Sequence, residues 1–442
     1  MFMRTHAGHV IQRLGHRAAR LGVCALLVAC VSPPGVRAQA NGSSGTAGAS
    51  SAVDAAAMLA PARLRTLPDS SRREWEAYVA RSTQAQAVDR ALLEREMQAA
   101  GTKAMTRAPH VAASFTYETP RTDAWFSTDS ARRMVASILS YQTPSGGWSK
   151  HVDFAGGPRA AGQSFFSESD KWQYIATIDN DATTAEVRFL MHAERVQRDS
   201  VVQRAIARGV EYLLNAQFPT GCWPQVWPLQ GGYHDAATFN DGAVVTVLEL
   251  LDQAARSNAT EVPDVLRVRA AGAVTRGVQC MLNAQVRVGG VLTIWGQQHD
   301  PITLAPTSAR SYELTSLTSK ESAGIFDFLL VHVSSDTRIP GALAAAAAWF
   351  DRTAIAGMRY DGRNGLVPDA SAGLLWARLY EIGTDQPMFS NRDGIKRYSF
   401  GELTDRRAGY GWYSDQPVSA LRRYRQWLTT RTTPKPAREW DR

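Results

Sequence analysis

A loosely repeated pattern along the chain is its strongest constraint on the fold. In each copy a helical run ends in a glutamine, at Gln142, Gln217 and Gln285, and glycine and tryptophan follow a few residues later. The glutamines lie 75 and 68 residues apart (142 to 217 and 217 to 285), which leaves room for two helices and their loops in each unit. Units of this kind bury their apolar faces by stacking on one another. The pattern therefore predicts an all-α fold of repeated helix pairs.

The segments between these markers favour helices over strands. Apolar residues recur at intervals of three and four, as at Val244, Val247 and Leu251, and alternating segments are scarce. We expect an (α/α) toroid, or barrel of helix pairs, over residues 121–442, with Gly- and Trp-rich loops that line a groove at one end. Residues 54–120 carry Leu and Ala at helical spacing among charged residues, so we expect a small helical N-terminal part.

The first forty residues are typical of a secretory signal peptide. They combine a basic start, an apolar run from Leu21 to Val31 and the small-residue triplet Ala38-Gln39-Ala40. The run is too short to span a bilayer, and no later segment approaches the ~20 apolar residues of a transmembrane helix. The alternative is a lipoprotein signal that ends before Cys30 and leaves a lipid anchor on it. Residues 41–53 are rich in Gly, Ser and Ala and predict a flexible linker, so we expect a secreted or periplasmic protein.

The net charge of +8 does not indicate nucleic-acid binding. Five arginines and no acidic residue lie in the first forty positions, and without them 44 basic residues face 41 acidic ones, a balance of +3. Nothing in the sequence indicates an obligate oligomer, so we expect a monomer. The mature chain keeps Cys222 and Cys280, which we interpret as buried thiols in preference to a disulfide.

Two acidic clusters stand directly before amphipathic helices. Asp179-Asn180-Asp181 precedes one helix, and Asn240-Asp241, interpreted as the counterpart of Asn180-Asp181, precedes another. A single Asp or Asn would cap a helix, but three consecutive oxygen-bearing side chains exceed what a cap needs. Carboxylate and amide oxygens are the ligands that calcium prefers, and two such helix starts could converge on one ion. A simple capping cluster is the alternative, because the regular loop of an EF-hand is absent.

The same loops carry cationic and aromatic side chains suited to an acidic sugar polymer. Lys150, two residues after Trp148, is interpreted as an anion contact. The rings of Trp223 and Tyr233 could stack on sugars, with packing in the core as the alternative for each. His234 could titrate near neutrality or serve as a loop hydrogen-bonding group. Guanidinium groups match carboxylates, and the candidates for this role are Arg310, Arg378, Arg392 and Arg407.

These segments resemble the pectate lyases of polysaccharide lyase family 10. The similarity runs from about Asp123 to Gly411 and is carried by long strings, namely Gln142 to Asp153, Thr177 to Leu190, Tyr212 to Leu251, Tyr312 to Phe328 and Trp376 to Arg392. The resemblance implies an incomplete (α/α) toroid with a groove and a calcium requirement. It also implies β-elimination of polygalacturonate (α-1,4-galacturonan, the backbone of pectin) to 4,5-unsaturated oligogalacturonides.

The resemblance also implies roles for single residues. Asp179 and Asp241 match the calcium ligands, with Asn180 beside them in the substrate site. Arg310 matches the arginine regarded as the base, and Arg378, Arg392 and Arg407 match arginines that bind galacturonate carboxylates. The sequence departs from the family at Ser149-Lys150-His151 and at Cys222. An arginine gives up its proton only with difficulty, so this role requires neighbouring cations, a metal ion and high pH, and it predicts an alkaline activity optimum.

Other enzyme classes explain the residues less well. Terpene cyclases share the helix-pair spacing, but the Asp-x-Asp-Asp initiator is absent from the sequence. A glycoside hydrolase would use Asp179 and Asp241 as its two carboxylates. A catalytically silent protein that binds acidic polysaccharide would keep the same aromatic and arginine side chains. All the charged positions of the lyase pattern are present, so we expect a lyase.

Overall fold

The computed structural model describes residues 58–117, 121–168, 175–256 and 261–435. The predicted signal peptide, the alternative lipid anchor at Cys30 and the linker lie outside these residues. Within the described ranges, no helix combines the length and the apolar character needed to cross a membrane.

The described chain is mainly helical, and its strands are short. The helices are α1 (Pro61–Leu64), α2 (Asp69–Ala99), α3 (Asp123–Phe126), α4 (Asp129–Ser140), α5 (Thr184–Val196), α6 (Ser200–Ala216), α7 (Ala243–Arg256), α8 (Asp264–Ala284), α9 (Ser319–Val331), α10 (Ile339–Thr353) and α11 (Gln416–Thr430). The strands are β1 (Ala237–Thr238), β2 (Arg287–Val288), β3 (Val291–Leu292), β4 (Gln298–His299), β5 (Pro306–Thr307), β6 (Leu317–Thr318), β7 (Met358–Asp361), β8 (Gly365–Pro368), β9 (Trp376–Ala377), β10 (Leu379–Tyr380), β11 (Phe389–Ser390), β12 (Lys396–Arg397) and β13 (Tyr413–Ser414).

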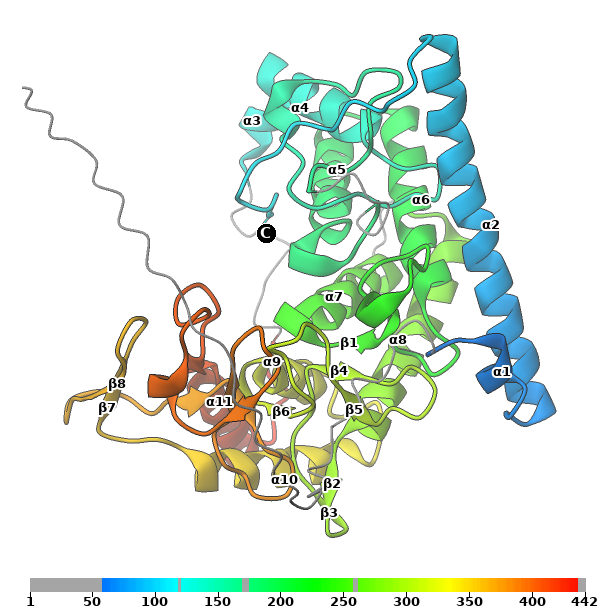
Figure 1. The fold of residues 1–442 in the computed structure, drawn as a ribbon. Helices are drawn as coiled ribbons and strands as arrows, with labels where there is room; N and C mark the ends of the chain where they lie inside the picture. The colour runs from blue at the N-terminus through cyan, green and yellow to red at the C-terminus, as the bar shows by residue number, and fades with distance from the viewer. Residues whose placement is uncertain (1–57, 118–120, 169–174, 257–260, 436–442) are drawn as a thin grey trace, which may run out of the picture. The chain divides into compact units, whose positions relative to one another are not determined.

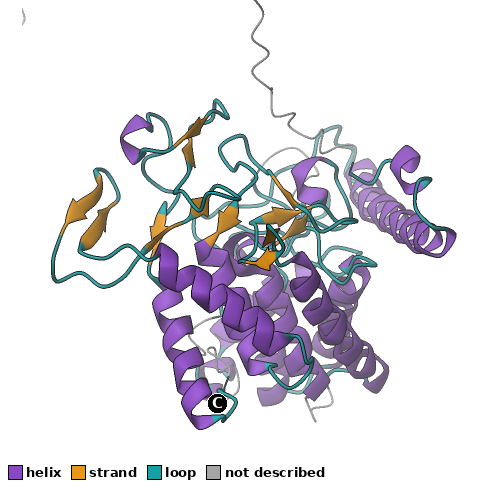
Figure 2. Ribbon diagram, turned by 90° about the horizontal axis from the view of Figure 1, so that it is seen from below, coloured by secondary structure: helices purple, strands orange, loops and turns teal. Residues whose placement is uncertain are grey.

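The helices pack as successive pairs. Helix α5 packs on α6, α7 on α8, and α9 on α10 and α11, and the inner helices α5, α7 and α9 also contact one another in turn (Figure 1). The strands pair antiparallel, as β1-β4-β5, β2-β3, β6-β10, β7-β8, β9-β13 and β11-β12. They gather at one end of the helices (Figure 2). The predicted all-α (α/α) toroid is confirmed.

Each repeat glutamine ties two successive outer helices together. Gln217, which follows α6, donates through Nε2 to the carbonyl oxygens of Gly221 and of Ala273 in α8, both at 2.9 Å. Gln142 makes the same two bonds between α4 and α6, and Gln285 makes them between α8 and α10. All three side chains are buried, so their amides satisfy carbonyl groups that water cannot reach.

The tryptophan of each repeat closes the turn that follows the glutamine. Trp148, Trp223 and Trp295 are each 0% exposed, and each donates its ring N–H to a carbonyl in the preceding helix. Trp376 bonds to Phe350 in the same way and forms a fourth copy that the glutamine pattern missed. The turn also needs glycine, because a Cβ on Gly221, at φ +92°, would lie 2.2 Å from a backbone oxygen of the next helix.

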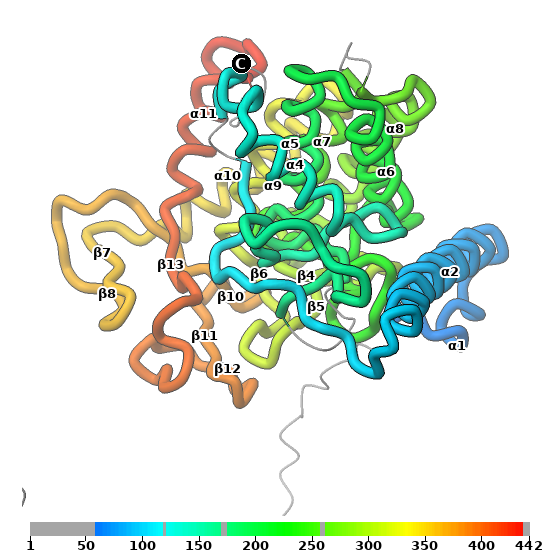
Figure 3. The backbone as a smooth tube through the Cα atoms, turned by 90° about the horizontal axis from the view of Figure 1, so that it is seen from above, coloured from blue at the N-terminus to red at the C-terminus, as the bar shows by residue number. Residues whose placement is uncertain are grey.

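The N-terminal helical part is confirmed as helical, and its main element is the long helix α2, which is seen end-on in Figure 3. Tyr78 donates to the carbonyl oxygen of Ala216 at the end of α6 (3.0 Å), and Asp89 accepts two bonds from Ser145 (2.7 and 2.8 Å). Trp75 belongs to the same hydrophobic core as the inner helices. Helix α2 is therefore fixed to the turns that join the repeats.

The interpretation of the two cysteines as separate thiols is wrong. Cys222, in the turn after α6, forms a disulfide with Cys280 in α8, with the Cα atoms 5.5 Å apart. Both residues are 0% exposed. The disulfide joins the same two outer helices, α6 and α8, that Gln217 ties together. The packing of these helices brings the two cysteines together, which their separation in the sequence did not reveal.

Candidate active site

The inner helices α5, α7 and α9 begin in one place. A 3-10 turn at Asp179–Asp181 precedes α5, and another at Asn240–Gly242 precedes α7. The two turns contact each other, the first also contacts α7, and the second also contacts α9. Side chains from segments far apart in the sequence therefore meet at this end of the toroid.

The backbone corrects the expected correspondence between the two acidic turns. Asn180 (φ 53°, ψ 43°) and Asp241 (φ 50°, ψ 24°) both adopt the left-handed conformation that Asn and Asp tolerate better than most residues. In each turn the preceding residue, Asp179 or Asn240, donates its N–H to the hydroxyl of a threonine two positions earlier. Asn180 is thus the counterpart of Asp241, and Asp179 is the counterpart of Asn240.

Only one carboxylate oxygen of Asp179 has a hydrogen-bond partner among the described residues. Its Oδ2 accepts a hydrogen bond from the ammonium group of Lys150 (2.7 Å), and Lys150 also lies 3.4 Å from Glu168. Asp179 is 5% exposed, and its Oδ1 is buried without a hydrogen-bond partner in the described part of the chain. A buried carboxylate oxygen in this state is suited to bind a cation.

Asp241 is held ionised by the cations around it. Its Oδ1 accepts from Lys320 at the start of α9 (2.8 Å) and from Arg378 (3.0 Å). Burial alone would raise its pKa, but Arg378 and Lys320 outweigh burial and lower the pKa of Asp241 to about 2. Arg378 is fixed in turn by an ion pair with the buried carboxylate of Glu321.

A chain of buried polar groups leads from this carboxylate to Arg310. Gln297 donates to Asn240 (2.7 Å) and lies within hydrogen-bonding distance of the Tyr410 hydroxyl (3.3 Å). Tyr410 also donates to Glu313 (3.1 Å), which accepts from Arg310. The predicted site residues did not include Glu313, Gln297 or Tyr410. These three side chains nevertheless connect the neighbourhood of Asp241 to Arg310, the predicted base.

Arg310 is paired directly with a carboxylate. Its Nε donates to Glu313 Oε2 (2.7 Å) and its Nη2 to Oε1 (2.5 Å), so Glu313 binds one edge of the guanidinium. Burial opposes the charged form, but the Glu313 carboxylate outweighs burial and raises the pKa of Arg310 above its ordinary value. Glu313 therefore opposes the neutral form of Arg310 that the predicted role as base requires.

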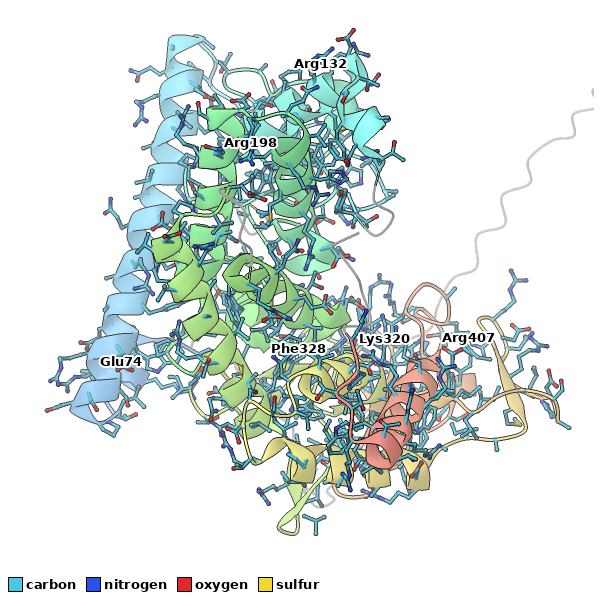
Figure 4. All side chains as sticks on the ribbon, turned by 180° about the vertical axis from the view of Figure 1, so that it is seen from behind. Glu74, Arg132, Arg198, Lys320, Phe328 and Arg407 are labelled. Carbon is cyan, nitrogen blue, oxygen red and sulfur yellow. A yellow bond between two sulfur atoms is a disulfide. The ribbon has the colours of Figure 1, made fainter. Side chains whose placement is uncertain are left out.

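The other predicted substrate contacts lie on the surrounding loops. Arg392 is exposed, and its backbone N–H donates to Asp405 (3.1 Å). Arg407, labelled in Figure 4, is half-buried, with its guanidinium 5.5 Å from the Phe400 ring centre. Tyr233 is half-buried, with its ring 4.0 Å from that of His234.

His234 does not titrate near neutrality. Burial lowers the pKa of His234 to about 4, and the nearby charges of Lys150 and Arg310 add to this effect while Asp179 opposes it. The imidazole bonds to Gln225 through Nδ1 (3.2 Å). The interpretation of His234 as a loop hydrogen-bonding group is therefore the correct one. Its interactions also show that Asp179, Lys150 and Arg310 share one electrostatic environment.

Two predicted substrate contacts are buried. Trp223 is 0% exposed and its ring N–H is bonded to Leu213, so it packs in the core and cannot stack on a sugar. Arg378 is 3% exposed, and its guanidinium is occupied by Glu321, Asp241 and the carbonyl of Tyr410. It therefore positions Asp241 and does not offer its fork to a galacturonate carboxylate.

One sequence signal could have identified Gln297 among the missed residues. The position two after each repeat tryptophan carries a polar side chain that reaches the site, and these positions are Lys150, Gln225, Gln297 and Arg378. The tryptophan is locked by its ring N–H bond, so the chain leaves each turn in the same direction. The side chain two positions later then points toward the inner helix ends, as the bonds of Lys150 and Gln297 show.

Comparisons with known proteins identify the family. A family model described as pectic acid lyase matches residues 142–421. The family 10 polysaccharide lyase from Cellvibrio cellulosa superposes with a TM-score of 0.61 at 33% identity, over 70% of this chain and 99% of that chain. A mutant of that enzyme in complex with trigalacturonic acid gives a TM-score of 0.59 at 34% identity, over 69% of this chain and 96% of that chain. A search of curated proteins finds no match.

The chain belongs to the pectic acid lyase family. The predicted resemblance to family 10 polysaccharide lyases and the predicted enzyme class, a pectate lyase, are both confirmed. In this lyase, the matched region takes in every residue of the acidic turns and of the Arg310–Glu313 pair.

The lyase offers few protein ligands for a metal ion. Across the described residues, no group of three or more His, Cys, Asp or Glu side chains is placed to hold one. Asp179 contributes a buried oxygen without a partner, and Asp241 contributes an ionised carboxylate. Calcium takes six to eight oxygen ligands, so these residues fit it only if water and substrate supply the others.

Proposed function

We propose that this lyase is secreted and cleaves polygalacturonate by calcium-dependent β-elimination, which leaves 4,5-unsaturated oligogalacturonides. The observation that carries the proposal is the meeting of Asp179, Asp241 and Arg310 at the inner helix ends. The positive charge of Arg310 helps to lower both the pKa of Asp241 and the pKa of His234. The charge of Asp179 acts on the pKa of His234 in the opposite direction. Elimination needs a base beside a site that neutralises a substrate carboxylate, and this arrangement offers both.

The substrate class follows from the charges of the site. Lys150 and Lys320 hold the two aspartates, and the arginines at 392 and 407 lie on the adjoining loops. Guanidinium groups bind carboxylates through paired hydrogen bonds, so a chain that bears one carboxylate on each sugar suits these loops better than a neutral glycan. The related lyase that was solved with trigalacturonic acid supports the same choice.

Asp179 and Asp241 are the residues that would hold calcium, with Asn180 beside them in the substrate site. Asp179 Oδ1, which has no hydrogen-bond partner among the described residues, fits the ion, and the opposite oxygen of that carboxylate is fixed by Lys150. Calcium bound there would supply positive charge next to the substrate carboxylate and so favour loss of the C5 proton. Because the protein supplies few ligands, we expect calcium to bind tightly only together with substrate.

Arg310, in its neutral form, would take the C5 proton. Its side chain is 40% exposed, and its Nη1 makes no hydrogen bond to any described residue. Arg392 and Arg407 would orient the galacturonate units on either side of the scissile bond. As C5 loses its proton, the bond from C4 to the glycosidic oxygen breaks and the double bond forms.

The proposal is tested by following the ultraviolet absorbance of the unsaturated product on polygalacturonate at alkaline pH, with calcium and then with EDTA. We expect absorbance that grows with calcium and stops when EDTA removes it. Reducing ends without absorbance would indicate a glycoside hydrolase, and neither signal would indicate a binding protein.

A pair of variants tests the role of Arg310. Arg310→Ala should lower kcat by about 10²–10⁴-fold, which is the usual contribution of a general base. The matched control is Arg132→Ala, because Arg132 also forms an i,i+3 pair, with Asp129, on the distant helix α4 (Figure 4). Normal turnover of Arg310→Ala would remove it from this role.

Secretion has a separate test. Mass spectrometry of the exported chain distinguishes cleavage after Ala40 from lipidation at Cys30. A chain that keeps its first forty residues in the cell would contradict the proposed location.

A further inference from the structure

Arg406 lies beside Arg310 and has no acidic partner. Its guanidinium carbon is 4.4 Å from the centre of the Tyr312 ring, and the guanidinium carbon of Arg310 is 5.1 Å from the same centre. Arg310 is paired with Glu313, whereas no carboxylate of the described residues forms an ion pair with Arg406. The Nε of Arg406 is buried without a hydrogen-bond partner in this part of the chain. An aromatic ring therefore supports the Arg406 guanidinium, and its counter-charge is missing.

The positive charge around Tyr312 exceeds the negative charge. Burial raises the pKa of Tyr312. One acid, Glu313, adds to this rise, and three arginines act against it, namely Arg310, Arg406 and Arg392. Arg392, like Arg406, forms no ion pair with any described residue. Because a partly buried cation without a counter-charge is unfavourable, a negative group of the substrate would stabilise this arrangement.

Arg406 also adjoins a guanidinium that was expected to bind substrate and does not. The guanidinium carbons of Arg378 and Arg406 are 4.4 and 5.6 Å from the centre of the Tyr410 ring. Arg378 is buried and its donors are occupied, whereas Arg406 is only half-buried. A galacturonate carboxylate can therefore contact Arg406 beside the position where Arg378 is closed to it.

We propose that Arg406 binds the carboxylate of a galacturonate unit next to Arg310, and that this contact makes the lyase select free carboxylates over methyl esters. The inference rests on the proposed function and deepens it.

The chemistry of the two groups explains the selection. A guanidinium donates paired N–H bonds to a carboxylate, and the opposite charges strengthen both bonds. A methyl ester has no negative charge, so the same guanidinium gains much less from it. The contact with Tyr312 restricts the Arg406 side chain before substrate arrives, which lowers the entropy that binding must remove.

Two variants of Arg406 test the contact. Arg406→Met keeps an apolar stem against the tyrosine rings and removes the charged guanidinium. We expect the KM for polygalacturonate to rise about 10–100-fold, the usual contribution of hydrogen bonds to a charged group, with kcat little changed. Arg406→Lys keeps the charge without the planar guanidinium, so it should recover only part of the loss.

The matched control is Arg81→Met on helix α2. Arg81 also lies against a buried tyrosine, with its guanidinium carbon 5.3 Å from the centre of the Tyr78 ring, but it lies outside the proposed site. This variant loses the same kind of ring contact and should leave KM unchanged.

A methyl-esterified substrate separates recognition of the carboxylate from simple packing on the tyrosines. The unmodified enzyme should have a higher KM for partly methyl-esterified polygalacturonate than for polygalacturonate. In Arg406→Met this difference should shrink, because acid and ester no longer differ at the contact. An equal rise of KM on both substrates would indicate packing alone and would overturn the proposal, as would an unchanged KM on polygalacturonate.

Failure of the proposed function can be told apart from failure of this contact. If the unmodified enzyme releases only reducing ends, the elimination fails and the same KM comparison is made on those ends. If it releases neither product, trigalacturonate stays uncleaved, and its Kd with calcium present, measured by titration calorimetry, replaces KM. A Kd about 10–100-fold higher for Arg406→Met would support the contact. An equal Kd, or no binding to the unmodified protein, would overturn it.

Discussion

Glu186, in the first turn of the inner helix α5, makes the stability of the fold depend on pH. Its side chain is 1% exposed, and one carboxyl oxygen is buried without a hydrogen-bond partner in the described structure. Burial raises the pKa of Glu186 from 4.5 to about 8, against the opposing effect of the backbone N–H groups of Thr183 and Glu186, and Asp181 adds to the rise. The folded protein therefore holds a proton that the unfolded chain releases.

The sign and size of the effect follow from this difference. Below about pH 4.5 Glu186 is protonated in both the folded and the unfolded state, so it adds no pH dependence. Above about pH 4.5 Glu186 ionises in the unfolded state only, which favours unfolding increasingly until the folded carboxyl ionises near pH 8. Each pKa unit corresponds to about 1.4 kcal/mol, so the rise from 4.5 to about 8 costs on the order of 5 kcal/mol at alkaline pH. Removing the charge should recover much of that cost.

The assay is urea unfolding of Glu186→Gln and of the unmodified protein at about pH 5 and about pH 9. We expect little difference in the free energy of unfolding at the acidic pH and several kcal/mol in favour of the variant at the alkaline pH. The control is Glu194→Gln on the same helix, because Glu194 accepts bonds from Asp199 (2.7 Å) and Gln203 (2.6 Å). That variant should lose about 1–3 kcal/mol at both pH values. An equal effect of Glu186→Gln at the two pH values would refute the reasoning.

Two further substitutions test the repeat. Trp223→Phe should lower the free energy of unfolding by about 1–3 kcal/mol, because it leaves the Leu213 carbonyl without its hydrogen-bond donor. The KM for polygalacturonate should stay unchanged. A raised KM with unchanged stability would restore the interpretation that Trp223 stacks on a sugar. Gly221→Ala should be destabilised by more than about 2 kcal/mol in thermal unfolding, since its Cβ would meet a backbone oxygen at 2.2 Å. Gly289→Ala, which also has a positive φ but meets nothing within 4 Å, should lose only about 1 kcal/mol, and equal losses for the two would contradict this account.

The sequence determined the repeat and the positions of the chemical groups. Gln142, Gln217 and Gln285, with the tryptophans that follow them, are local signals, because each closes a turn next to its own helix. The acidic turns before α5 and α7 were also recognisable, since short polar side chains at helix starts form a local pattern. These signals sufficed for the toroid and for the positions of Asp179 and Asp241.

Tertiary structure decided which of these groups are free to act. Trp223 and Arg378 look like ligands in the sequence, but the packing of the helix pairs buries both, and burial depends on segments that lie far away in the chain. The pairing of Cys222 with Cys280 has the same origin. Glu313 lies only three residues from Arg310, yet its effect on that group depends on burial and on a fixed loop geometry. A residue's type follows from the sequence, whereas its exposure, its partners and therefore its charge state follow only from the fold.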